Sequence, residues 1–210
     1  MAKRIFDLIA ALLGLILLLP VLLIVGILIV LDSPGPVFYL GDRIGKDGKP
    51  FKIFKFRTMV INADQMGSAL THGGDPRVTR VGRVLRQWKM DELPQLINVL
   101  RGEMSIVGPR PESPGYVEHY TPEQRQVLGA KPGITGLTQI KFRHEESLLN
   151  QYKDRERAYI DTIMPYKLAL DLEYIKAQSF VVDLGLIFQT FLALFEVEEL
   201  TDLESGPVVG

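Results

Sequence analysis

Two adjacent carboxylates, Asp91 and Glu92, are the residues of this 210-residue chain whose types and surroundings most clearly suggest chemistry. They stand in the run RQWKMDELPQLINVLRGEMSIVGPRPE, which begins at Arg86 and carries a second arginine, Arg110, near its end. Guanidinium groups bind phosphate oxygens, and a carboxylate can act as a nucleophile or a metal ligand. The local pattern leaves a structural alternative open, because acids favour a helix N-terminus and Pro94 suits its first turn.

The composition of the chain excludes several classes of site. Its 24 basic and 25 acidic residues give a formal net charge of −1, so no global basic field favours a nucleic-acid partner. The absence of cysteine excludes disulfides, thiolate metal sites and a cysteine nucleophile. The three histidines, His72, His119 and His144, lack the spacing of a zinc motif. The sequence also has no Asp-x-Asp triplet and no glycine-rich Rossmann turn, which argues against a glycosyltransferase of the usual metal-dependent kind.

An uncharged apolar segment from Leu8 to Leu31 predicts a membrane anchor over residues 1–36. A helix of about 24 residues covers a hydrocarbon core of about 30 Å at 1.5 Å per residue. A cleaved signal peptide is the alternative. We disfavour it because the apolar segment is longer than a signal core and no small-x-small cleavage pattern follows it.

Basic residues flank the apolar segment on both sides. Lys3 and Arg4 precede it, and six lysines and arginines follow it between Arg43 and Arg57. The positive-inside tendency places both flanks on the cytoplasmic side, which a straight span does not satisfy. Pro20 permits a sharp bend near the middle of the segment. We therefore expect a re-entrant hairpin helix that returns to its own leaflet, with a proline-kinked spanning helix as the alternative.

Residues 37–197 are predicted to form one small α+β domain that is mostly helical. A β-hairpin is expected where VFYL and FKIFKFRTM flank the turn-like GDRIGKDGKP, followed by a loop over residues 62–75. The proline-rich SIVGPRPESPGY is predicted to be a fixed loop, KPGITGLTQIKF a turn that feeds a strand, and residues 198–210 a disordered acidic tail. Helices are expected from Val78, over Pro94–Leu100 with a stop at Gly102, from Thr121 with a capping-box spacing, and over Glu145–Ile160, Met164–Lys176 and Phe180–Val197.

Two of these helices have patterns that suit a membrane surface. The first carries an apolar stripe that ends at Trp88, with arginines on its other positions, and this pattern favours anionic headgroups. An ordinary helix packed on the core is the alternative for this segment. The last helix is apolar but is interrupted by Asp183, Gln189 and Glu196, which predicts an interfacial or buried helix rather than a second span.

The order of these motifs resembles that of the monotopic phosphoglycosyl transferases, a group of bacterial sugar transferases. KRIFDLIAA precedes the apolar helix, and SPGPVFY, GKDGKPFKIFKFRTM, DPRVTRVGRVLRQWKMDELPQLINVLRGEMSIVGPRP and KPGITGLTQI follow in order over nearly the whole chain. The resemblance implies transfer of a phospho-sugar from a UDP-sugar to a polyprenol (undecaprenyl) phosphate, with release of UMP, at the start of glycoconjugate assembly. It also implies a re-entrant anchor, amphipathic interfacial helices and a catalytic domain on the cytoplasmic face of the bacterial inner membrane.

The resemblance makes Asp91 the nucleophile of a ping-pong mechanism with a covalent aspartyl phospho-sugar, and a ligand of Mg²⁺. Mg²⁺ between the carboxylate and the diphosphate oxygens would relieve the repulsion between two anions. We expect Glu92 to position Asp91 or the metal. Its alternative role is to accept a proton from the polyprenol phosphate, which is already mostly ionised at pH 7 and needs little base.

Basic side chains are the expected ligands of the substrate phosphates. Arg86 and Arg110 are the principal candidates, and Pro109 and Pro111 restrict the loop that carries the second of them, although surface salt bridges are an alternative role for both arginines. Further candidates for nucleotide or headgroup contacts are Lys55, Arg57, Lys131 and Gln139. Many members of the family continue after Gln139 with an Asn-Gly-Arg-like turn where this chain reads IKFRHEE, so the resemblance does not extend to the identity of the sugar.

The sequence is also compatible with two other functions. One is a non-enzymatic, membrane-tethered scaffold or binding protein of a glycan pathway, and the other is a glycosyltransferase that moves the sugar alone. The nucleotide product separates all three functions, because a phosphoglycosyl transferase releases UMP, a sugar transferase releases UDP and a scaffold releases neither. A homo-oligomer is compatible with the sequence.

Overall fold

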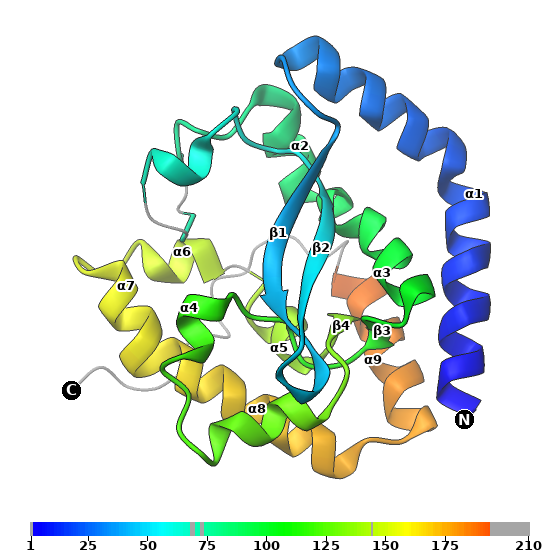
Figure 1. The fold of residues 1–210 in the computed structure, drawn as a ribbon, viewed down its shortest axis with the longest axis vertical. Coiled ribbons are helices and arrows are strands. Elements are labelled where there is room, and N and C mark those ends of the chain that lie inside the picture. Colours follow the sequence, from blue (N-terminus) through cyan, green and yellow to red (C-terminus); the bar gives the residue numbers. More distant parts are fainter. Residues whose placement is uncertain (1, 68–69, 72–73, 144, 194–210) are drawn as a thin grey trace.

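The computed structural model describes residues 2–67, 70, 71, 74–143 and 145–193. One long N-terminal helix, α1 (Ala2–Asp32), lies along a body built from short helices around two small sheets (Figure 1). Helix predominates over strand among the described residues, so the predicted mostly helical α+β class is confirmed. The end of the last predicted helix and the predicted acidic tail lie outside the described residues.

The α1 helix is continuous, with Pro20 inside it. Figure 1 shows its axis following the body and then bending over the far end of the hairpin, so the expected hairpin is one bent helix rather than two helices joined by a turn. Most of its apolar side chains point outward, with Leu17 and Leu31 76% and 78% exposed. Ala11, Val25 and Ile29 instead pack on the body. Within the described residues, α1 is the one helix that is long and apolar enough to cross a membrane. A contiguous apolar surface of this size marks a region that contacts lipid or another protein.

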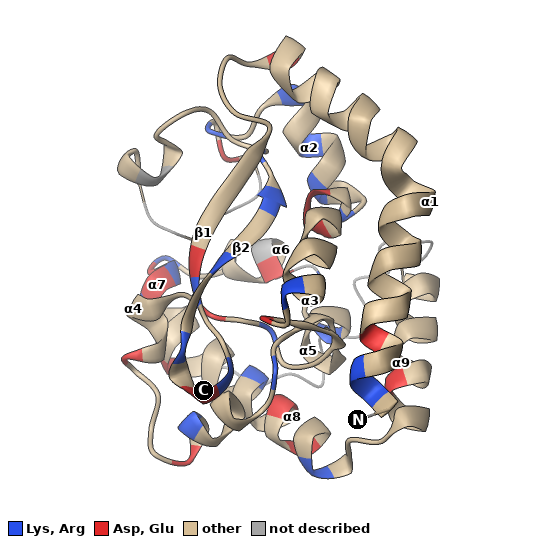
Figure 2. Ribbon diagram, turned by 45° about the vertical axis from the view of Figure 1, so that its right-hand side comes forward, with Lys and Arg blue, Asp and Glu red and all other residues tan. Residues whose placement is uncertain are grey.

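The N-terminal end of α1 is fixed to the body by buried polar contacts. Asp7 is 2% exposed and accepts hydrogen bonds from the hydroxyl of Ser105 at 2.9 Å and from the backbone N–H of Ile106 at 3.0 Å. Arg4 donates to the backbone carbonyl of Val99 at 2.7 Å. Figure 2 shows that the charged residues of α1 are confined to its two ends.

The C-terminal end of α1 is fixed to the same body. Asp32 accepts a hydrogen bond from the backbone N–H of Val81 at 2.9 Å. Arg57 is buried, and its guanidinium donates to the carbonyls of Ser33, at 2.7 Å, and Pro34. Both ends of the apolar helix are therefore held by one domain.

The predicted β-hairpin is present. Strands β1 (Phe38–Ile44) and β2 (Pro50–Phe56) pair in an antiparallel register that places Phe38 opposite Phe56. The connecting turn contains Asp47 at φ 58°, a left-handed conformation that aspartate tolerates better than most residues. The hairpin lies across the middle of the molecule in Figure 1, over the turn that carries the paired carboxylates.

A second, parallel sheet corrects the predicted loop over SIVGPRPESPGY. Strand β3 (Ser105–Val107) pairs in parallel with β4 (Gly133–Thr135), and the short helix α4 (Pro114–Val117) completes the segment. The two strands approach closely because glycine stands at the contact, where a Cβ on Gly133 would lie 2.0 Å from the backbone nitrogen of Gly108. Strands of three residues tolerate the flanking prolines that predicted irregular structure.

The segment KPGITGLTQIKF also differs from the prediction. Its strand comes first, as β4, and helix α5 (Leu137–Lys141) follows it. The β-branched residues favoured a strand throughout, but the parallel pairing partner of β4 is only three residues long. The chain therefore leaves the sheet at Gly136 and forms a helix.

The segment around the paired carboxylates folds largely as predicted. Helix α2 (Arg80–Gln87) is capped by Thr79, whose hydroxyl accepts from a backbone N–H of the first turn. A 3-10 turn, η3 (Met90–Gln95), then leads into α3 (Leu96–Arg101). The helix ends at Gly102, which has φ 83°, as the glycine predicted.

The charged helix predicted over residues 145–160 is broken. Helices α6 (Glu145–Leu149) and α7 (Arg155–Ala158) replace it. Asp154 caps α7 by accepting a hydrogen bond from the backbone N–H of Arg157, so a new helix begins there. A pattern of alternating charge lacks the apolar stripe that would hold a single long helix against the body.

The remaining helices close the body. Thr121 and Gln124 form the predicted capping box, with the backbone N–H of Thr121 donating to the side chain of Gln124 at 2.9 Å. The element that follows is a 3-10 helix, η4 (Gln124–Gly129). A π-helical turn, η5 (Tyr159–Ile163), runs directly into α8 (Met164–Ala177). The main apolar cluster joins these elements and consists of Tyr116, Val117, Tyr120, Val127, Leu149, Tyr159, Ile163, Met164 and Leu168.

Helix α9 (Phe180–Ala193) turns an apolar face outward. Val181 and Phe188 are 78% and 62% exposed, whereas Asp183 is buried and accepts a hydrogen bond from the hydroxyl of Tyr174 at 2.6 Å. An outward apolar face with a buried polar anchor suits a helix at a membrane interface. Of the two predicted interpretations of this segment, the structure favours the interfacial helix.

Candidate active site

Asp91 and Glu92 lie in η3, directly after α2. Lys89 joins the two elements with φ 53°, a left-handed conformation that is strained for lysine. This turn reverses the chain and brings both acids beneath β2, where Asp91 is 7% and Glu92 is 9% exposed. The two carboxylates are therefore buried rather than displayed at a solvent-facing helix N-terminus.

Glu92 is held by two cations. Its Oε1 accepts hydrogen bonds from Nζ of Lys55 at 2.8 Å and from Nη2 of Arg110 at 2.9 Å. Burial raises the pKa of Glu92, but Arg110 and Lys55 lower it further, and the net pKa lies well below its ordinary value. A carboxylate that stays ionised in this environment is better suited to act as a fixed anion than as a proton acceptor.

Asp91 has the opposite environment. Burial raises the pKa of Asp91, and Glu92 raises it further, against the lowering effects of Lys55, Arg86 and Lys89. Its Oδ1 is buried and has no hydrogen-bond partner among the described residues. Leaving a buried polar group unpaired costs about 1–3 kcal/mol, so such a group points to a bound ligand or a catalytic role.

The environment of Asp91 fits a divalent cation that is shared with substrate. Mg²⁺ in phosphoryl-transfer sites is held by one or two carboxylates together with substrate phosphates. No group of three histidine, aspartate or glutamate side chains that could hold a metal occurs in the part of the chain that the structure describes. The unpaired Oδ1 of Asp91 is the protein oxygen best placed to contribute.

Arg86 lies near Asp91, in the last turn of α2. Its charge lowers the pKa of Asp91, and its Nε donates to the hydroxyl of Thr58 at 2.9 Å. Thr58 is 7% exposed and lies just beyond β2. Gly82 lets α2 approach this segment, because a Cβ there would lie 2.1 Å from the carbonyl oxygen of Thr58.

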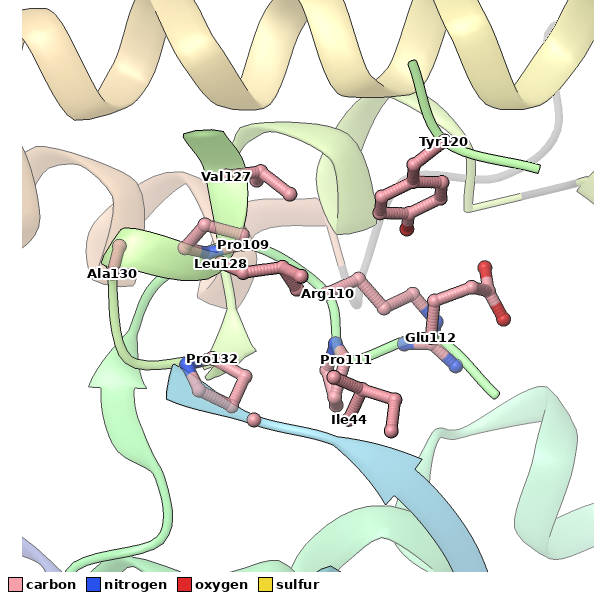
Figure 3. Close-up of a pocket in the computed structure, with 11 residues that line it drawn as sticks. Ile44, Pro109, Arg110, Pro111, Glu112, Tyr120, Val127, Leu128, Ala130 and Pro132 are labelled. Carbon is pink, nitrogen blue, oxygen red and sulfur yellow. The ribbon is translucent and has the colours of Figure 1, made fainter. Parts of the chain in front are cut away.

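Arg110 reaches Glu92 from the loop at Pro109–Pro111, which follows β3. The loop is fixed at its start, where the carbonyl of Pro109 accepts a hydrogen bond from the backbone N–H of Gly133 at 2.8 Å. A cavity of about 20 Å³ lies against the loop, and Figure 3 shows the ring of Tyr120 on one side of Arg110. The loop therefore lies against Tyr120, Val127 and Leu128, which line the same cavity.

The other candidate residues do not join the paired carboxylates. The guanidinium of Arg57 is occupied by carbonyls at the end of α1. Lys131 lies beside Arg4, and its pKa is lowered by burial and by that arginine. Gln139 donates to the carbonyl of Gly108 at 3.4 Å, behind the loop that carries Arg110.

Two residues of the site were not identified from the sequence. Thr58 could have been singled out by its place in FKFRTM, directly after two candidate cations. Lys89 gives no such signal, because a left-handed backbone is rare for lysine and the sequence was interpreted as a continuing helix there.

Comparison with known proteins identifies the family. The model of the family described as bacterial sugar transferase matches residues 1–197. This chain belongs to the bacterial sugar transferase family. The predicted resemblance is thereby confirmed, and this family member is a transferase.

Curated relatives of this family member are named as sugar phosphotransferases or as an exopolysaccharide production protein. It is 39% identical over 201 residues to a UDP-glucose:undecaprenyl-phosphate glucose-1-phosphate transferase of Caulobacter vibrioides. This match covers 93% of this chain and 70% of the relative. It is 40% identical over 198 residues to the exopolysaccharide production protein PSS of Rhizobium leguminosarum bv. phaseoli, covering 91% of this chain and 94% of the relative. It is 38% identical over 193 residues to a UDP-N-acetylgalactosamine-undecaprenyl-phosphate N-acetylgalactosaminephosphotransferase of Aeromonas hydrophila, covering 90% of this chain and 42% of the relative.

Proposed function

We propose that this chain transfers a phospho-sugar from a UDP-sugar to undecaprenyl phosphate, releases UMP and so begins the assembly of a glycoconjugate. The observation that carries the proposal is the buried carboxylate of Asp91, whose Oδ1 has no partner among the described residues and which Arg86 and Lys55 face. The relatives from Caulobacter and Aeromonas support the substrate classes, since their names combine a UDP-sugar with undecaprenyl phosphate.

In the first step, a carboxylate oxygen of Asp91 attacks the phosphorus that carries the sugar. The bond from that phosphorus to the bridging oxygen of the diphosphate breaks, and UMP leaves with the electron pair. In the second step, an oxygen of undecaprenyl phosphate attacks the same phosphorus and releases the carboxylate. An aspartyl acyl phosphate is an established type of covalent intermediate, and the two steps give ping-pong kinetics.

The surrounding cations bind and orient the two anionic substrates. Arg86 lies on the Asp91 side of the site and is the proposed ligand of the diphosphate. Arg110 uses one of its five N–H donors for Glu92, and its fixed position suits a second phosphate contact. Glu92 is the proposed positioning residue, because it holds Lys55 and Arg110 beside the nucleophile.

Mg²⁺ is the proposed cofactor, with Asp91 as its protein ligand. When bound, it supplies charge neutralisation between the carboxylate and the diphosphate oxygens and stabilises the leaving UMP. The high cost of bringing an anionic nucleophile to an anionic diphosphate is the physical reason for this requirement.

The proposed location is the cytoplasmic face of the bacterial inner membrane, with residues 1–36 as a re-entrant anchor and residues 37–197 as the catalytic domain. A straight helix of the length of α1 would separate its ends by about 45 Å. Asp7 and Asp32 nevertheless both bond to the same domain, which supports a helix that enters and leaves one leaflet. Such an anchor holds the site at the depth where the phosphate of a lipid substrate lies.

The proposal is tested by nucleotide release. Purified protein in detergent, supplied with Mg²⁺, undecaprenyl phosphate and a panel of UDP-sugars, is expected to release UMP with at least one sugar. Release of UDP would instead indicate transfer of the sugar alone, and no release with any sugar would favour a scaffold. With UDP-sugar but no lipid acceptor, intact-protein mass spectrometry is expected to detect a phospho-sugar adduct that maps to Asp91.

A further inference from the structure

Another buried aspartate, Asp171, lies behind the loop that carries Arg110 and takes no part in the proposed reaction steps. It stands on α8 and is 3% exposed. Its Oδ1 lies 2.9 Å from the hydroxyl oxygen of Thr138, and the backbone of Arg110 hydrogen-bonds to the same carboxyl group. Asp171 therefore contacts the main chain of the residue whose side chain holds Glu92.

The hydrogen bonds around Thr138 require a further proton. Its hydroxyl oxygen lies 2.9 Å from Oδ1 of Asp171 and 3.0 Å from Oε1 of Gln139, yet the hydroxyl can donate to only one of them. The amide nitrogen of Gln139 donates to the carbonyls of Gly108 and Gly133, which turns its oxygen toward Thr138. If Asp171 carries a proton, it donates to Thr138, Thr138 donates to Gln139, and every group has a partner.

Burial outweighs the effect of the cations near Asp171 and favours the neutral carboxylic acid. Burial raises the pKa of Asp171 to about 7, against the lowering effects of Thr138, Lys167 and Arg110. Lys167 stands one turn earlier on α8 and forms its own ion pair with Glu145 at 2.8 Å. Tyr120 faces Asp171 from the segment before η4, and its pKa is raised by burial and by nearby acids. The side-chain charge of Arg110 is directed at Glu92.

We propose that Asp171 is a positioning residue that acts as a neutral carboxylic acid and holds the Pro109–Pro111 loop in place from behind. It acts directly on the backbone of Arg110, and through Thr138 and Gln139 on Gly108 at the start of the loop. The loop in turn sets the Nη2 of Arg110 on Glu92. The effect on catalysis rests on the proposed transferase reaction, whereas the effect on the loop does not.

Three substitutions separate the neutral state of Asp171 from its positioning role. Asp171→Asn keeps an acceptor for Arg110 and a donor for Thr138 but has no charge, so it mimics the neutral acid. Asp171→Leu keeps the branched outline in a bulkier side chain and removes both hydrogen bonds. Thr138→Val, at a position that is 0% exposed, breaks the link to Gln139 without changing the side-chain shape. Glu173→Leu on the exposed face of α8 is the matched control.

The first readout is hydrogen–deuterium exchange of the peptide over residues 105–112, measured by mass spectrometry on the full chain in detergent. The second is UMP release with separate kcat and KM values. We expect Asp171→Asn and Glu173→Leu to leave both within about twofold of wild type. We expect Asp171→Leu and Thr138→Val to raise exchange of this peptide at least about tenfold and to lower kcat about 10- to 100-fold, because small displacements of a positioned group cost catalysis disproportionately.

Each part has an outcome that overturns it. If Asp171→Leu and Thr138→Val leave both loop exchange and kcat unchanged, Asp171 does not position the loop. If Asp171→Leu unfolds the whole domain, Thr138→Val decides the same question. If Asp171→Asn is as damaging as Asp171→Leu, the charged form is required and the neutral acid is wrong. If no variant and not even wild type releases UMP while loop exchange changes as expected, the proposed reaction fails and the positioning role stands.

Discussion

The Nη2 of Arg110 lies 2.9 Å from Oε1 of Glu92, an oxygen that Lys55 also contacts at 2.8 Å. These two cations lower the pKa of Glu92 below its ordinary value despite burial, whereas burial leaves Asp91 with a raised pKa. Two adjacent carboxyl groups therefore have opposite electrostatic environments, which is how proteins give neighbouring acids different roles. Glu92 is suited to hold the site together, and Asp91 to react.

Asp91→Asn is expected to abolish transfer without weakening the fold. The amide cannot form the acyl phosphate, so UMP release should fall by at least about a thousandfold. The substitution also removes a buried charge whose Oδ1 has no partner among the described residues, so the midpoint of thermal unfolding should stay equal or rise. Turnover near the wild-type rate in this variant would remove Asp91 from the role of nucleophile.

Glu92→Gln is expected to destabilise the domain by about 1–3 kcal/mol, because Lys55 and Arg110 lose the anion that they share. The partial exposure of Arg110 to solvent reduces this loss of stability. The pKa of Glu92 is well below its ordinary value of 4.5 in the folded chain, so its stabilisation is fully present above pH 4.5 and declines as the pH falls from 4.5 toward the folded pKa. Chemical denaturation should therefore show a larger difference from wild type at pH 7 than at pH 3.5. Glu118→Gln, at an exposed position, is the control and should differ from wild type at neither pH.

Much of this site could be predicted because its residues lie in one short segment. Asp91, Glu92 and Arg86 fall within seven consecutive positions, and Arg110 is marked by its two flanking prolines. The hairpin and the stop at Gly102 follow from alternation and glycine geometry, which are local properties. Local signals therefore identified the paired carboxylates and two of the cations beside them.

The remainder depends on contacts between distant parts of the chain. Lys55 meets Glu92 across 37 positions, and Asp171 meets Thr138 across 33. Strands β3 and β4 have three residues each, too few for an alternation pattern to identify. In the sequence, Lys55 is one of several cations in a strand and Asp171 is an acid in a helix. Only the tertiary packing distinguishes them from other residues of the same type.

Gly82→Ala is expected to damage both stability and activity. The new Cβ would lie 2.1 Å from the carbonyl oxygen of Thr58, so α2 must move away from Thr58. Arg86 stands on α2 and donates a hydrogen bond to the hydroxyl of Thr58, so its guanidinium would be displaced. Overpacking of this kind costs about 1–3 kcal/mol, and the displaced guanidinium should lower kcat/KM at least about tenfold. Gly115→Ala is the matched control, since its Cβ meets nothing within 4 Å and should leave thermal unfolding and UMP release near wild type. Equal behaviour of the two variants would contradict the close packing of α2 on Thr58.

The titration of Asp171 should be visible in the free energy of unfolding. Its pKa is about 7 in the folded chain against an ordinary 3.8, so between these values the folded state binds a proton that the unfolded state does not. Stability from this group therefore declines as the pH rises from about 4 to about 7 and is constant above. Asp171→Asn cannot titrate, so its stability relative to wild type should increase by a few kcal/mol over that interval. A difference that is independent of pH would show that Asp171 is ionised throughout.

The re-entrant anchor predicts that both ends of α1 lie on one side of the membrane. The chain has no native cysteine, so Ala2→Cys and Asp47→Cys each introduce a single thiol, the first at the start of α1 and the second in the hairpin turn. A membrane-impermeant maleimide should label neither variant in intact spheroplasts and both in inverted vesicles, because Asp7 and Asp32 bond to one domain. Labelling after detergent treatment controls for thiol accessibility. If Ala2→Cys is labelled in intact spheroplasts while Asp47→Cys is protected, α1 spans the bilayer, and the contacts of Asp7 with β3 must then break in the membrane.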